Sequence, residues 1–259
     1  MKVRLALLVI LIVIASACGE YEKLLKSPDY ELKKTKLKEY YEDGQYARAS
    51  ELLSQVLPRY RATDEAEELM WLNAQCFYGM KDYMMAGAEF KSLSELYPYS
   101  QYAEDSFFLA AMCDYYLSPR PELDQESSRM AVEGFTIFIT KFPSSPKVED
   151  AKRYISLLRE KIVEKSYLSA RLYYDMKQYK SAVTALNNSL KEFPETKYRE
   201  EMMYLKLYSQ YLYAQNSIST RQNERFQTTL MNTTPLWKNF PRVPIQRMCR
   251  KYIVKLPGY

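Results

Sequence analysis

The sequence contains no histidine among its 259 residues. This absence excludes the Ser-His-Asp arrangement, histidine metal sites and a histidine general base. The six glycines are scattered, so they form neither a phosphate-binding loop nor a Gly-x-Gly-x-x-Gly turn. Neighbouring acids such as Glu67 and Glu68 point about 100° apart on a helix, which suits capping or solvent-facing charges better than an acid–base pair. We therefore expect no enzyme activity, no cofactor and no metal.

Long hydrophobic runs are also absent beyond the first residues of the chain. Residues 5–14 are apolar and follow a basic start, but a helix of ten residues rises only about 15 Å, half of what a bilayer requires. With the small residues that follow, this pattern predicts that residues 1–17 are a cleaved signal peptide. Residues 14–18 (Ile-Ala-Ser-Ala-Cys) resemble the lipobox of bacterial lipoproteins, which implies an acylated Cys18 and attachment to a membrane. The alternative is an ordinary signal peptide with an incidental cysteine.

Cysteine and net charge place few further limits on the mature chain. Removing residues 1–17 leaves 242 residues with a formal charge of +3. The full sequence is 47% hydrophobic, which is ample for a core. Three cysteines remain besides Cys18, an odd number that implies no disulfide framework in an exported protein.

The feature that is present is an internal repeat of about 37 residues. A shift of 37 maps Tyr46 onto Tyr83, Ala49 onto Ala86 and Trp71 onto Phe108. Two later units, in 131–146 and 176–194, repeat an aromatic-Pro ending, and each such ending is followed six and seven residues later by two acids. Acids favour the first turn of a helix. Each unit is therefore predicted to contain two helices and a proline that ends the second, after which the next helix begins.

These units resemble the tetratricopeptide repeat in their spacing of small residues, aromatics and proline. We expect an all-α fold, an α-solenoid of about five tetratricopeptide-like helix pairs that spans residues 18–230. The expected pairs cover residues 30–58, 64–96, 100–141, 146–192 and 196–230. One helix, within 147–177, is long for a repeat, and we expect it to be bent or divided near residues 165–166. The segment 231–259 is expected to be a basic, proline-containing tail.

The first helices of such repeats line the concave side of a solenoid. In the second and third repeats, residues at i, i+4 and i+7 share one helical face. A stripe of large side chains on that face would suit an extended peptide with alternating apolar residues, and we expect it to be confined to the early repeats. The alternative is that the rings are ordinary core. The predicted peptide-binding residues are Trp71, Gln75, Tyr78, Phe108, Met112 and Tyr115.

A lipobox, about five repeats and the segment Tyr-Pro-Tyr-Ser-Gln-Tyr at 97–102 together resemble the BamD family, outer-membrane lipoproteins of the β-barrel assembly machinery. The resemblance covers residues 18 to about 230. It implies a scaffold on the periplasmic face of the outer membrane that binds the POTRA domains of the barrel-forming subunit through its C-terminal half. It also implies that the N-terminal half receives unfolded β-barrel clients.

Two other classes of lipoprotein remain open from the sequence. A SusD-like glycan-binding protein would use the aromatics to stack on sugars, although such proteins are about twice this length. A generic periplasmic tetratricopeptide adaptor would bind partners other than a barrel subunit. The run after Glu224 has seven Lys or Arg and no acid, which suits an acidic partner surface, and export disfavours nucleic acid as that partner.

Overall fold

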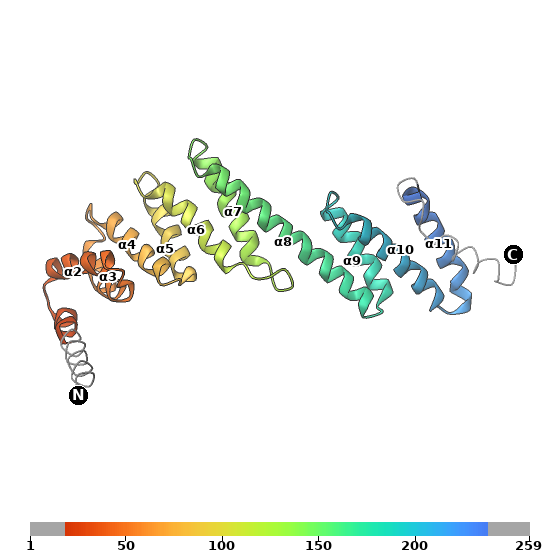
Figure 1. Ribbon diagram of the computed structural model, residues 1–259, viewed down its shortest axis with the longest axis horizontal. Helices are drawn as coiled ribbons and strands as arrows, with labels where there is room; N and C mark the ends of the chain where they lie inside the picture. The colour runs from red at the N-terminus through yellow and green to blue at the C-terminus, as the bar shows by residue number, and fades with distance from the viewer. Residues whose placement is uncertain (1–18, 238–259) are drawn as a thin grey trace, which may run out of the picture. The chain divides into compact units, whose positions relative to one another are not determined.

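The computed structural model describes residues 19–237, and throughout that range the regular structure is helical (Figure 1). The all-α, tetratricopeptide-like architecture expected from the repeats is therefore confirmed. Residues 19–26 are helical, and the helices that follow are α2 (Tyr30–Glu42), α3 (Tyr46–Tyr60), α4 (Ala66–Gly79), α5 (Tyr83–Leu96), α6 (Ala103–Leu117), α7 (Glu126–Lys141), α8 (Val148–Asp175), α9 (Tyr179–Glu192), α10 (Arg199–Gln215) and α11 (Ser219–Trp237).

The helices begin and end at the prolines, acid pairs and capping residues seen in the sequence. α5, α7 and α9 each end one residue before an aromatic-Pro pair, because proline cannot donate a helical hydrogen bond. The acid pairs fall in the first turns of α6, α8 and α10, where they favour the helix dipole. Asp82 caps α5 by accepting a hydrogen bond from the amide of Met85 at 3.2 Å.

The helices divide into two compact units within α8. Within the described range, one unit comprises residues 19–118 together with 126–156, and the other comprises 119–125 together with 157–237. α8 is nevertheless one uninterrupted helix of 28 residues, so of the two expectations, a bend or a division, the division near residues 165–166 is wrong. Two distinct cores supported by one continuous helix explain why this helix is twice the usual repeat length.

Residues 118–125 connect α6 to α7, and 119–125 belong to the second unit. The buried Gln125 side-chain amide donates to the carbonyls of Arg120 and Leu123 at 2.9 and 3.2 Å. The ammonium of Lys165 in α8 donates to the carbonyl of Glu122 at 2.6 Å. These contacts satisfy backbone groups that a loop would otherwise leave to water.

Three turns between paired helices share one backbone device. The second residue after the first helix of each pair has a left-handed conformation, with φ of 72° at Gly44, 61° at Lys81 and 60° at Lys177. In each turn the next amide donates to the carbonyl five residues earlier at 2.8 or 2.9 Å. This Schellman arrangement stops a helix and reverses the chain. Glycine usually occupies this position, but lysine does so in two of the three turns.

We expect Lys81→Gly to stabilise the protein. Glycine adopts positive φ without the steric cost that lysine carries, and the larger chain entropy of unfolded glycine offsets part of the gain. The free energy of unfolding should rise by up to about 1 kcal/mol, measured by urea denaturation. Lys36→Gly, inside α2, is the matched control and should lose a similar amount. A destabilised Lys81→Gly would contradict the turn assignment.

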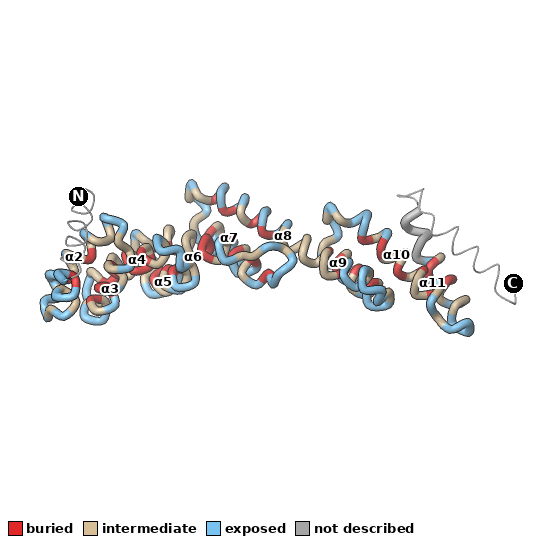
Figure 2. The backbone as a smooth tube through the Cα atoms, turned by 60° about the horizontal axis from the view of Figure 1, so that its bottom comes forward, coloured by how far each residue is buried: buried red, intermediate tan, exposed pale blue. Residues whose placement is uncertain are grey.

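Buried residues follow the sides of helices that face their neighbours, while exposed residues gather at turns and outer faces (Figure 2). Each unit has a core of its own. In the first unit Ala86, Phe90 and Cys113 are fully buried in one cluster, and in the second Ala182 and Leu186 occupy the equivalent place. The small alanines let adjacent helices approach, which is the role the repeat pattern assigned to them.

The first helical residues are tied to the first repeat. The hydroxyl of Tyr21 donates to the carboxylate of Glu51 at 2.7 Å, and its ring meets that of Tyr40 edge-on at 5.6 Å. The buried ammonium of Lys33 donates to the carbonyl of Leu25 at 3.0 Å and to the side chain of Gln55 at 2.6 Å. The helical residues 19–26 are therefore packed against the first repeat.

Two sequence-based assignments lie at or beyond the ends of this range. The signal peptide, residues 1–17, and Cys18 fall outside the described residues. At the other end, α11 continues to Trp237, so a helix includes the first residues of the segment 231–259 that was expected to be a tail. Residues 238–259 lie outside the described range.

Candidate binding surface

The predicted stripe on α4 is half-buried, and its rings contact neighbouring helices. Trp71 packs on Phe90 of α5 at 5.5 Å and stacks on Tyr102, just before α6, at 5.2 Å and 17°. Tyr78 meets Phe90 edge-on at 6.1 Å and Tyr116 of α6 at 6.3 Å. Gln75 lies between them on the same face and is also half-buried. The stripe thus joins consecutive repeats while keeping part of its surface open.

The equivalent stripe on α6 is more deeply packed. Phe108 contacts the rings of Phe135 and Phe138 on α7 at 5.6 and 5.3 Å. Tyr115 lies 4.7 Å from the ring of Tyr154 on α8, within the first unit. Met112 is only 5% exposed and contributes almost no surface. The structure places all six predicted residues on two adjacent helices, and their role in binding a peptide stays a prediction.

A tyrosine stripe in the second unit was missed from the sequence. Tyr204, Tyr208 and Tyr211 lie at i, i+4 and i+7 on α10, with neighbouring ring centroids 5.9 and 6.1 Å apart in near-parallel planes. Tyr208 also contacts Tyr174 of α8 at 6.2 Å, and Tyr204 remains 41% exposed. The expectation that a stripe of large side chains is confined to the early repeats is therefore wrong.

The position of this second stripe could have been predicted from the sequence, because the repeated acid pairs align α10 with α6. Glu200-Glu201 lies 96 residues after Glu104-Asp105, and the same offset places Tyr204, Tyr208 and Tyr211 in register with Phe108, Met112 and Tyr115.

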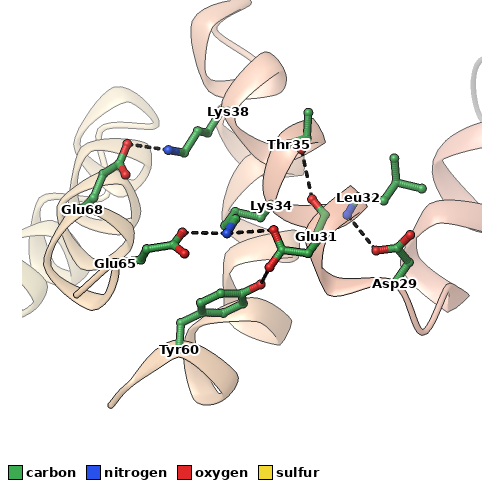
Figure 3. Close-up of polar contacts among 9 residues, drawn as sticks. All are labelled: Asp29, Glu31, Leu32, Lys34, Thr35, Lys38, Tyr60, Glu65 and Glu68. Atoms are coloured by element: carbon green, nitrogen blue, oxygen red, sulfur yellow. Dashed lines mark hydrogen bonds and ion pairs between the residues drawn. The ribbon is translucent and has the colours of Figure 1, made fainter. Parts of the chain in front are cut away.

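Charged residues near the start of α2 and α4 form a network rather than a catalytic pair (Figure 3). The ammonium of Lys34 lies 2.9 Å from Glu31 and 2.7 Å from Glu65, and Tyr60 donates a hydrogen bond to Glu31. Hydrogen bonds to Glu65 and then Glu31 raise the pKa of Lys34, and the hydrogen bond from Tyr60 is the first cause that lowers the pKa of Glu31. These groups stabilise each other's ionised forms, which suits a tie between helices.

Acids at the starts of first helices repeatedly reach the neighbouring repeat. Glu68 pairs with Lys38 of α2 at 2.6 Å, and Asp105 pairs with Lys147, which precedes α8. In the second unit Glu201 lies 3.4 Å from Arg171 of α8. Partly exposed ion pairs of this kind each contribute up to about 1 kcal/mol to the free energy of unfolding. They therefore matter more for how neighbouring repeats align than for overall stability.

Reactive chemistry is sparse in residues 19–237. No group of three or more Cys, Asp or Glu side chains in that range could hold a metal ion. Cys76 and Cys113 are free and buried, and burial raises the pKa of each thiol to about 12. Within the same range, no helix combines the length and apolarity needed to cross a bilayer.

Comparison with known families gives one match. The family model described as "YfiO: Outer membrane lipoprotein" matches residues 30–226, which run from the start of α2 into α11. No curated protein matches the chain. The family match covers both units and most of the sequence, and YfiO is the BamD family that the repeats and the lipobox resembled. The chain belongs to the YfiO family of outer membrane lipoproteins.

Proposed function

We propose that this protein is a lipid-anchored scaffold on the periplasmic face of the outer membrane. In this proposal it binds the POTRA domains of the barrel-forming subunit and unfolded β-barrel clients during outer-membrane protein assembly. The role is one of binding rather than catalysis, and the anchor is acylated Cys18. The observation that carries the proposal is the family match across residues 30–226.

The charge distribution supports two different binding partners. The first unit, from residue 19, has 22 acidic and 16 basic residues, whereas residues 238–259 have six Lys or Arg and no acid. A surface of one sign steers and selects partners of the other sign. The basic end of the chain therefore suits an acidic surface on the barrel subunit.

The aromatic stripes support binding of an extended client segment. Alternating apolar side chains of a β-strand can contact successive rings, and rings bury large area at low entropic cost. The half-buried Trp71 and Tyr78 offer such rings in the first unit, and the exposed Tyr204 offers one in the second.

Titrating the mature chain with a labelled peptide from a barrel-protein C-terminus tests the stripe. We expect the double variant Trp71→Ala, Phe108→Ala to lose affinity, because a buried aromatic anchor can contribute about 2 kcal/mol, or roughly thirtyfold in Kd. Both rings also pack on neighbouring helices, so helicity and melting must be compared first. Tyr40→Ala removes a half-buried ring from α2, where it contacts Tyr21 rather than a residue of the stripe, and is the matched control.

Co-purification of the same variants with the barrel subunit separates the two partners. The double variant should still co-purify with the barrel subunit. Truncation after Met231 should weaken binding to the barrel subunit, and the binding that is left should depend less on salt concentration, because screened charges have been removed. Unchanged peptide affinity in a folded double variant would refute the stripe as the client site. If no barrel subunit co-purifies with the parent chain, the proposed function itself is refuted.

A further inference from the structure

A groove lies along a different face of α6 from the stripe, between α5 and α7 in the first unit. Its volume is about 580 Å³, within the range of sites that bind small ligands or peptide side chains. α6 supplies its floor through Phe107, Ala110, Ala111 and Asp114, whereas the stripe uses residues turned by about 100° on the same helix. The three helices stand next to one another in Figure 1.

The helices beneath the groove pack closely against one another. A Cβ atom on Gly134 of α7 would lie 2.9 Å from the Cβ of Ala111, so only glycine allows this approach of α6 and α7. A Cβ on Gly87 of α5 would likewise lie 3.2 Å from the Cβ of Cys113. Small residues at both contacts bring α5 and α7 close to α6.

The walls of the groove are apolar and open to solvent. Met130 is 47% exposed and Ile137 is 40% exposed, both on α7, and Pro98 continues the apolar lining on the other side. The ammonium of Lys141 lies 4.0 Å from the centre of the Phe107 ring at one end. Water-facing apolar side chains gathered in a concave site are typical of surfaces that bind a partner.

The other end of the groove contains a carboxylate without a direct partner. Asp114 is half-buried, and in the described part of the chain it forms no hydrogen bond or ion pair. Burial raises its pKa, and Lys91 opposes that rise only through a longer-range charge interaction. Glu95 and Glu133 face the same groove from α5 and α7. A partly desolvated carboxylate is stabilised by a cation that brings its own hydrogen bonds.

We propose that this groove binds a short segment of a partner protein in which a lysine or arginine is flanked by bulky apolar side chains. The cation would meet Asp114, and the apolar side chains would lie on Phe107 and Ile137. From Phe107 to Asp114 the helix rises about 10 Å, the length of three residues of extended chain. Asp114 therefore selects the sign of the ligand, and the apolar side chains of the floor and walls supply contact area.

The test uses two fluorescein-labelled peptides in a serine-glycine background, one containing Leu-Leu-Ser-Lys and the other Leu-Leu-Ser-Glu. Fluorescence anisotropy of each peptide is measured against the mature chain. The lysine peptide should bind at least about tenfold more tightly, because a charge-assisted hydrogen bond discriminates strongly between the two. Equal binding of the two peptides would overturn the proposal.

Three variants separate the groove from other surfaces. Asp114→Asn should weaken the lysine peptide about tenfold and remove its preference over the glutamate peptide. Ile137→Lys should also weaken it, since it places a positive charge on an apolar wall. Glu89→Gln, on α5 outside the groove, is the matched control and should bind like the parent. Parent-like binding by Asp114→Asn would overturn the proposal.

Folding of these variants is checked independently. Because burial raises the pKa of Asp114, its ionised form opposes folding at neutral pH, so Asp114→Asn should melt at or above the parent temperature. That difference should shrink as the pH falls and the parent carboxyl becomes protonated.

Sedimentation of the chain without peptide tests whether a second copy of the chain occupies the groove. A dimer that Ile137→Lys dissociates would overturn the assignment to a partner segment.

Discussion

Replacing Ala86 by aspartate is expected to unfold the first unit. The Ala86 side chain has no exposed surface and packs among Ala74, Phe90 and Cys113, so a carboxylate there would be buried without a partner. Such burial costs several kcal/mol, which is comparable with the 5–15 kcal/mol that stabilises a whole domain. Circular dichroism melting should show the first unit already unfolded or melting far below the parent.

The matched control is Ala88→Asp, two residues away on an exposed position of the same helix. It should change the melting temperature little, because a solvated carboxylate incurs no burial cost. Ala182→Asp should have the same large effect in the second unit, where Ala182 is fully buried and Ser181→Asp is its exposed control. Parent-like melting of either buried variant would show that the repeat phasing is wrong.

Hydrogen exchange can show how far each defect spreads. Since the two units have separate cores, Ala86→Asp should abolish protection in α4–α6 and leave α9 and α10 more protected. Lower pH should partly restore the variant, because a buried carboxyl has a raised pKa and its protonated form is less costly to bury.

Cys18→Ala is expected to release the protein from the membrane. Two or three acyl chains, at about 0.8 kcal/mol for each buried methylene, retain a protein on a bilayer, and the remaining chain has no helix within residues 19–237 that could replace them. Fractionation should move the variant from the membrane pellet to the soluble fraction or leave it as unprocessed precursor. Intact mass should show acyl groups on residue 18 of the parent.

This variant should fold normally, which distinguishes lost anchoring from lost structure. The contacts of Tyr21 and Lys33 with the first repeat do not involve residue 18. Cys76→Ala is the matched control, because it also removes a thiol yet should stay in the membrane fraction. A mature N-terminus elsewhere, or an unmodified Cys18 thiol in the parent, would show that the lipobox assignment is wrong.

The sequence by itself determined the helix pairs and their ends. A proline that cannot continue a helix and acids that favour the helix dipole are local signals, and the two occur together after α5, α7 and α9, with the acids six and seven residues beyond the proline. This is why the start of α2 at Tyr30 and the end of α5 at Leu96 agree with the expected boundaries. The family match later confirmed the outer membrane lipoprotein class that these repeats and the lipobox indicated.

The turns and the division into units depended on tertiary structure. Lysine at positive φ in two turns is unfavourable locally, and it is retained because the packed helices on either side require the reversal there. The 28 residues of α8 form one helix because their backbone hydrogen bonds are satisfied locally, while the two cores on it are separated by contacts from distant segments.

Burial of the candidate binding residues was likewise decided by packing between helices. Periodicity placed Trp71, Phe108 and Met112 on common helical faces, but the face alone does not reveal how much of each side chain a neighbouring helix covers. Met112 is buried and Tyr204 is exposed although they belong to stripes in equivalent register. The groove lined by Asp114 and Ile137 exists only where α5, α6 and α7 meet, because residues far apart in sequence form its floor and walls.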